Sequence, residues 1–142
     1  MEQALAWMDR AIYFRVMGVK NFHTLSTKAA VLIKMNRVEE AKKVMEEAIP
    51  MGSMNEVHFY GRTLLIQKMP QDAMKVFKMN FEKYPNVFTT NVGLGRAYSA
   101  VGEYKKALGY MKAALPQSPD EANKSRVESM IKKLEEGKDI NQ

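Results

Sequence analysis

Apolar side chains recur along the chain at a spacing of four residues, in a pattern that appears four times. In each copy an alanine is followed four residues later by a large apolar residue, and by another after four more. Residues four apart lie on one face of an α-helix, so each copy predicts a helix that packs through this stripe. The copies are Ala4, Met8 and Ile12; Ala41, Met45 and Ile49; Ala73, Phe77 and Phe81; and Ala107, Met111 and Leu115.

A further helix is predicted upstream of each of the last three copies. A small residue stands near its middle, at Ala29, Gly61 and Gly95, which are 32 and 34 residues apart. Small residues let the two helices of a pair approach closely, and the large residue of the downstream helix fills the space beside that contact. The pattern predicts helical hairpins over residues 22–50, 55–84 and 87–115, after an unpaired helix near 2–15.

Turn residues separate the predicted helices. Asn36 and Gly102 follow two of the upstream helices, and Pro70 stands in the first turn of a downstream helix, where its missing N–H costs least. Tyr84-Pro85-Asn86 is expected to be a loop between hairpins. These positions agree with the hairpin boundaries that the apolar pattern indicates.

A last helix is predicted near residues 119–136. Ser118 is expected to be its N-cap, with Pro119 at the first helical position, Glu121 completing a capping box and Gly137 at C′. One apolar stripe opposite charged faces is what the terminal helix of a stack requires. The stripe consists of Val127, Met130, Ile131 and Leu134.

The segment from Phe88 to Pro119 resembles the 34-residue tetratricopeptide repeat (TPR) pattern. The resemblance implies right-handed superhelices of helical hairpins, which bind peptides or protein partners on a concave surface. The residues that carry it are Gly95, Tyr98, Gly102, Ala107, Met111, Ala114 and Pro119.

The expected fold is therefore all-α, a TPR-like α-solenoid of stacked antiparallel hairpins with about eight helices and a C-terminal capping helix. We expect a single domain over residues 1–142. Its expected parts are a half repeat at 1–16, repeats at 21–53, 54–86 and 87–119, a capping helix at 119–137 and a tail at 138–142.

The unpaired first helix predicts an exposed apolar face. Trp7 and Tyr13 lie on this helix, and the surface they would pack against belongs to a missing partner helix. A contact with another domain or a homodimer through this helix is one interpretation, and truncation of a longer natural array is the other.

Charge and composition narrow the function. The net charge of +6 is spread evenly along the chain, so the sequence lacks the concentrated basic patch of a nucleic-acid-binding module. No apolar run is long enough to span a bilayer. There is no cysteine, and the two histidines, His23 and His58, fall in different repeats, so no metal or other cofactor is expected. No catalytic motif is present, and we expect no enzyme.

The TPR resemblance also assigns residues of the upstream helices to a binding groove. Arg62 and Arg96 occupy equivalent positions in adjacent repeats and could hold an acidic peptide side chain between them. The alternative is that both arginines are solvated and pair with nearby acids. The full set of predicted groove residues is Arg62, Arg96, His58, Asn55, Ser99 and Lys34.

The favoured function is a non-enzymatic scaffold that binds a protein or peptide partner. The two arginines favour an acidic partner. The alternative is a structural or oligomerisation appendage of a larger protein whose other domain carries the activity. The ending EANKSRVESMIKKLEEGKDIN is similar to the TPR tail of certain exported Bacteroidetes proteins, which follows a β-rich domain. That resemblance implies a periplasmic or otherwise exported location, and without it a cytoplasmic one is expected.

Overall fold

The computed structural model describes residues 20–142. In this range it has seven α-helices, two short 3-10 helices and no strand. The all-α helical repeat predicted from the sequence is thus confirmed. The chain divides between Ser53 and Met54 into two compact units, which are described separately. This division coincides with the predicted boundary between two repeats, while the number of domains stays a prediction.

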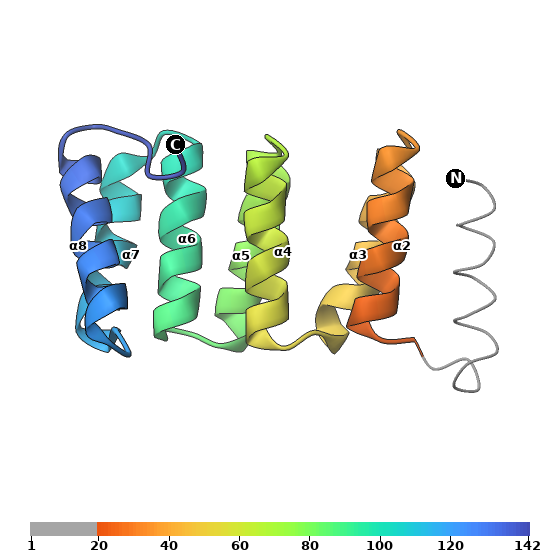
Figure 1. Cartoon of the computed structure of the whole chain (residues 1–142), viewed down its shortest axis with the longest axis horizontal. Coiled ribbons are helices and arrows are strands. Elements are labelled where there is room, and N and C mark those ends of the chain that lie inside the picture. Colours follow the sequence, from red (N-terminus) through yellow and green to blue (C-terminus); the bar gives the residue numbers. More distant parts are fainter. Residues whose placement is uncertain (1–19) are drawn as a thin grey trace. The chain divides into compact units, whose positions relative to one another are not determined.

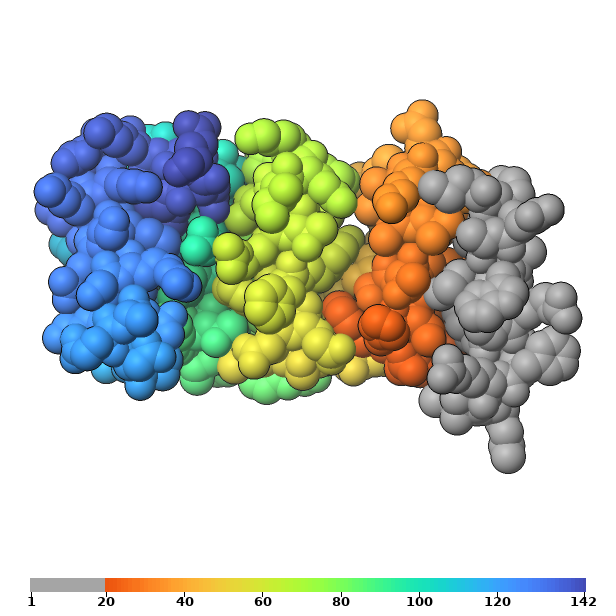
Figure 2. All heavy atoms as spheres, viewed as in Figure 1, coloured from red at the N-terminus to blue at the C-terminus, as the bar shows by residue number. Residues whose placement is uncertain are grey.

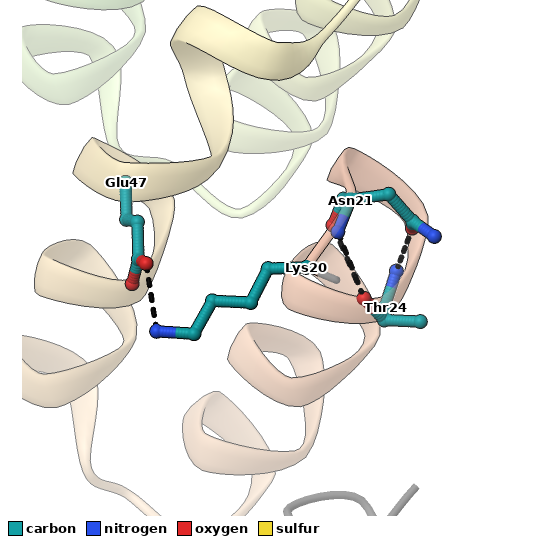
Figure 3. Close-up of polar contacts among 4 residues, drawn as sticks. All are labelled: Lys20, Asn21, Thr24 and Glu47. Atoms are coloured by element: carbon teal, nitrogen blue, oxygen red, sulfur yellow. Dashed lines mark hydrogen bonds and ion pairs between the residues drawn. The ribbon is translucent and has the colours of Figure 1, made fainter. Parts of the chain in front are cut away.

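The unit that precedes Met54 contains one described helical hairpin. It consists of α2 (Phe22–Lys34) and α3 (Val38–Ala48), followed by the 3-10 helix η1 (Ile49–Met51). A capping box starts α2, in which the Thr24 N–H donates to Asn21 Oδ1 at 2.9 Å (Figure 3). Lys20 Nζ lies 2.8 Å from Glu47 Oε1, and this ion pair connects the start of α2 to the end of α3 (Figure 3).

The unit that begins at Met54 contains two hairpins and a final helix (Figure 1). The first hairpin is α4 (Met54–Ile66) with α5 (Pro70–Lys83), and the second is α6 (Phe88–Ala100) with α7 (Tyr104–Ala114). The 3-10 helix η2 (Leu115–Gln117) leads to α8 (Glu121–Glu135), which packs on α7. In addition to the pairs within each hairpin, α4 and α5 both contact α6.

The repeated alanine and its large neighbour are core residues, as the sequence predicts. Ala41, Ala73 and Ala107 are all buried, and so are the residues four positions later. The small residues on the upstream helices allow the close approach expected of them. A Cβ atom at Gly61 would lie 2.6 Å from the Phe77 ring, and one at Gly95 would lie 2.6 Å from Met111 Cε.

The turns inside the three hairpins share one backbone geometry. Asn36, Lys68 and Gly102 have φ values of 62°, 62° and 82°, in the left-handed region that ends many helices. In each turn the next N–H donates to a carbonyl five residues back, as from Arg37 to Leu32 at 2.8 Å. Pro70 begins α5 as predicted.

The predicted cap of the last helix is wrong at its start. Asp120 is the N-cap, and its Oδ1 accepts from the Asn123 N–H at 2.8 Å. The Ser118 hydroxyl instead donates to the Leu115 carbonyl at 2.8 Å and closes η2. A carboxylate interacts more favourably than a hydroxyl with the positive end of a helix dipole. At the other end, Gly137 has φ 72° and follows the C-cap, as predicted.

The tail after α8 returns to α6 (Figure 1). Ile140 is 6% exposed and joins the core that α6, α7 and α8 share. The Ile140 N–H donates to Ser99 Oγ at 2.9 Å, and Asn141 Nδ2 donates to the Arg96 carbonyl at 2.9 Å. The last residues are therefore part of the folded unit. The predicted first helix, with Trp7 and Tyr13, lies outside the described residues.

Candidate interaction site

Helices α4, α6 and α8 form one continuous face of the second unit. Figure 2 shows this face in space-filling form, with α6 visible as a narrow band between α4 and α8. Two cavities open on it, a larger one of about 490 Å³ and a smaller one of about 160 Å³. We call the residues that line them the α4–α6–α8 face.

Arg62 of α4 and Arg96 of α6 line both cavities. The larger cavity is bounded by Lys68 and the tail residues Asp139 and Asn141 as well. Aromatic and aliphatic side chains contribute to the smaller cavity, among them Phe59, which is 62% exposed. The two arginines therefore lie at the same cavities within this unit, and their role in binding stays a prediction.

Arg96 carries its charge in an unfavourable setting. Burial, together with the nearby charges of Arg62 and Arg126, lowers the pKa of Arg96 to about 10. Its Nε atom is buried and has no hydrogen-bond acceptor. A buried donor without an acceptor is rare in folded proteins, because its desolvation is not compensated. Arg96 therefore has bonding capacity that the described residues do not use.

His58 lies beside the arginines in the smaller cavity. Burial is the main cause that lowers the pKa of His58 to about 4, and the charges of Arg62 and Arg96 add to the effect. The ring is uncharged at neutral pH as a result. It packs edge-on against Phe77, with the ring centres 5.5 Å apart, and its Nδ1 atom is buried without a partner.

Asp139 is the one acidic residue that lines the larger cavity. Its Oδ1 atom accepts from the Ser99 hydroxyl at 2.7 Å, from the Asn141 N–H at 3.0 Å and from Asn141 Nδ2 at 2.8 Å. These bonds fix the tail against α6. Within residues 20–142, neither Arg62 nor Arg96 forms an ion pair.

A comparison with known protein families identifies one segment of the chain. Residues 23–49 match the model of the tetratricopeptide repeat. This segment is a tetratricopeptide repeat. It covers α2, apart from its first residue, and α3. No curated protein and no solved structure matches the chain significantly. Tetratricopeptide repeats typically act as protein-interaction scaffolds, through the extended surfaces that stacked hairpins create.

The structure brings together three of the six predicted groove residues: His58, Arg62 and Arg96. Asn55 is exposed and lines neither cavity. Ser99 is 1% exposed and its hydroxyl is engaged by the tail, so it is not available as a groove hydroxyl. Lys34 is the last residue of α2, inside the tetratricopeptide repeat, and is exposed there.

Arg126 is the main residue of this site that the sequence analysis missed. It was given no role in the sequence analysis, yet it lines the smaller cavity and its charge acts on Arg96. A signal was present in the repeat period. Positions 58, 92 and 126 are 34 residues apart, so Arg126 continues the series of His58 and Val92 on a third helix. Equivalent positions on α4, α6 and α8 therefore contribute to this face.

A second surface of the same unit has a different character. A cavity of about 470 Å³ is lined by Phe81, Tyr98 and Tyr110, with Lys106 at its side. The two tyrosine rings are stacked, with centres 5.5 Å apart, and Lys106 Nζ lies 5.5 Å from the centre of the Tyr98 ring. Neither of the buried polar atoms that lack a partner in the described residues, His58 Nδ1 and Arg96 Nε, lies in this cavity.

In residues 20–142, no group of three His, Asp or Glu side chains is placed to hold a metal ion. Across the same range, no helix has the length and apolar character needed to cross a membrane.

Proposed function

We propose that this chain is a non-enzymatic scaffold that binds a protein or peptide partner through the α4–α6–α8 face. The observation that carries the proposal is the position of Arg62 and Arg96. They line the same two cavities, from adjacent helical hairpins, and form no ion pair with a described residue. A guanidinium group can bind a carboxylate through two parallel hydrogen bonds, so two such groups favour an acidic partner.

Exposed apolar residues beside the arginines support this function. Phe59 lines the smaller cavity and Ile66 the larger one, and they are 62% and 76% exposed. Interfaces combine apolar contact with arginine anchors, and aromatic residues are enriched in them. A peptide that lies along this face would cover these two side chains while its acidic groups contact the arginines.

The proposal is tested by selecting binders from a randomised peptide library rich in Asp and Glu. The affinity of a selected peptide is then compared between the wild type and the double variant Arg62→Ala/Arg96→Ala. Loss of charge-assisted hydrogen bonds is expected to weaken binding by about tenfold to a hundredfold for each arginine that contacts an acid. Binding should also weaken as salt is added, because added ions screen these charges.

The matched control is Lys105→Ala/Lys112→Ala, which removes two positive charges from exposed positions on α7. It should bind the selected peptide as the wild type does. Equal affinity of the wild type and the arginine double variant would exclude the α4–α6–α8 face as the binding surface. Failure to select any binder would contradict the scaffold function itself.

A further inference from the structure

Three arginines from three different helices surround the smaller cavity of the α4–α6–α8 face. Arg62 comes from α4, Arg96 from α6 and Arg126 from α8. No acidic residue is among the side chains that line this cavity of about 160 Å³. Three positive charges are therefore gathered around a small space, although the net charge of the whole chain is spread evenly.

An arginine outside this cavity, Arg37, has its charge neutralised by an acidic side chain. Arg37 donates from Nε to Glu40 Oε1 at 3.0 Å and from Nη2 to Glu40 Oε2, which forms a forked ion pair. No corresponding pair is found at Arg62, Arg96 or Arg126 among the described contacts. The three arginines repel one another without compensation, so an anion bound among them would remove an existing cost.

The number of charges and donors indicates which anion fits. A carboxylate carries one negative charge and two oxygens, which suits one guanidinium fork. A phosphate monoester carries about −1.5 to −2 charges near neutral pH and three strong acceptor oxygens. Its three oxygens can accept hydrogen bonds from three separate guanidinium groups, and its charge compensates more of their repulsion.

The walls of the cavity suit a phosphate carried on a peptide. Phe59 and Phe88 line it together with Val92 and Met130, and Phe59 is 62% exposed. These side chains offer apolar contact to the residues that flank a modified side chain. A nucleic-acid backbone would instead require a basic stripe that follows successive phosphates. The cavity of about 160 Å³ has space for one such group.

We propose that the cavity between Arg62, Arg96 and Arg126 binds the phosphate group of a phosphorylated side chain in the partner. This inference rests on the proposed scaffold function and specifies the chemistry of its ligand. It also gives a role to Arg126, which is not part of the site formed by Arg62 and Arg96 alone. Binding of such a partner would then depend on a kinase and be reversed by a phosphatase.

The test uses three matched peptide libraries that differ at one fixed central residue: phosphoserine, serine or glutamate. We expect selection on the full chain to enrich phosphoserine peptides. Removing the phosphate from a selected peptide should weaken binding by about tenfold to a hundredfold, as expected for lost charge-assisted hydrogen bonds. In NMR spectra of the labelled protein, the Arg96 Nε–H signal should shift with the phosphopeptide and stay in place with its serine counterpart.

Two variants on α8 separate the site from general charge. Arg126→Gln should weaken the phosphopeptide by about tenfold or more. Lys124→Gln, which changes an exposed lysine two residues away, should leave the affinity unchanged. Both positions are exposed, so neither change is expected to disturb folding, and circular dichroism checks this.

Several outcomes would overturn the inference. Glutamate peptides that bind as well as phosphoserine peptides would show a carboxylate site, and the scaffold function would stand without the phosphate. Phosphopeptide binding that is insensitive to Arg126→Gln would place the phosphate elsewhere. Stronger binding of inorganic phosphate or an inositol phosphate than of any phosphopeptide would identify a different source of the anion. Absence of binders from all three libraries would contradict the proposed function as well.

Discussion

Two buried polar groups of α6 differ in their hydrogen bonding. Near its start, Asn91 Nδ2 donates to Asn86 Oδ1 at 3.1 Å and to Gln117 Oε1 at 2.8 Å. Near its end, the Nε of Arg96 is buried without an acceptor. We call the first group, Asn86, Asn91 and Gln117, the closed cluster, because its side chains bond to one another. We call the arginines at positions 62, 96 and 126 the open cluster. The difference separates polar groups that hold a helical repeat together from polar groups that are available to a partner.

The closed cluster joins segments that the sequence separates widely. Gln117 follows α7, and its Nε2 donates to the Asn86 carbonyl at 2.8 Å, so the loop before α6 is bonded to the segment before α8. Thr90 adds a bond from its hydroxyl to the Tyr84 carbonyl at 2.7 Å. Each buried group in this cluster has a partner, which makes it a structural element. Changes in the two clusters should therefore have different consequences.

The largest effect is expected in the closed cluster. Asn91→Ala removes a side chain that is 1% exposed and leaves the acceptors on Asn86 and Gln117 without their donor. The free energy of unfolding should fall by about 2 kcal/mol, as measured by urea denaturation. Asn55→Ala, an exposed asparagine on α4, is the matched control and should change stability by less than about 0.5 kcal/mol. A loss no larger than that of the control would show that the cluster is not structural.

A smaller effect of opposite sign is expected in the open cluster. Arg96→Met keeps an unbranched apolar stem but removes a half-buried charge that has no acidic partner. The free energy of unfolding should rise by about 1 kcal/mol, while binding of an acidic or phosphorylated peptide should weaken by about tenfold to a hundredfold. Lys105→Met, at an exposed position of α7, is the control for the change to methionine. A destabilised Arg96→Met protein would place Arg96 with the structural polar groups and remove the contrast.

The smallest effect concerns the pH dependence that His58 contributes. Its pKa is about 4 in the folded chain and 6.5 is the ordinary value, so the unfolded state binds more protons between these pH values. Stability should therefore rise as pH increases from about 4 to 6.5 and gain nothing more from His58 above that range. The measurement is the difference in melting temperature between wild type and His58→Gln across this window.

If His58→Gln keeps the wild-type profile, burial beside the arginines does not suppress its protonation. A bound anion would oppose the effect of Arg62 and Arg96, so the phosphopeptide should reduce the His58 contribution. This links the smallest prediction to the open cluster.

Much of the fold could be predicted because the signals are local in sequence. The alanines and their neighbours four residues later predict packed stripes, since residues at that spacing share a helical face. The glycines at positions 61 and 95 predict close helix contacts because they have no side chain, and Phe77 and Met111 lie against them. The turn at Lys68 was harder to place, because lysine has no preference for a positive φ and takes it only under the surrounding packing.

The site was predictable only in part. The 34-residue period placed Arg62 and Arg96 on one surface, since equivalent positions of stacked repeats become neighbours. The same period applied to α8 would have included Arg126. No periodic signal could show that the tail turns back, because the return of residues 138–142 depends on Ile140 finding a place in the core.

The sequence alone determined the helices of the described range and their pairing into hairpins, because these follow from short-range periodicity and from the size of single side chains. The tertiary structure decided which polar groups are closed and which are open. Ser99 is hydrogen-bonded to Asp139 and Ile140, which are forty or more positions away. Arg96 lies near the charges of Arg62 and Arg126 and forms no ion pair with an acid in the described residues. Satisfaction of a buried polar group depends on every segment that packs around it, and only the folded chain brings those segments together.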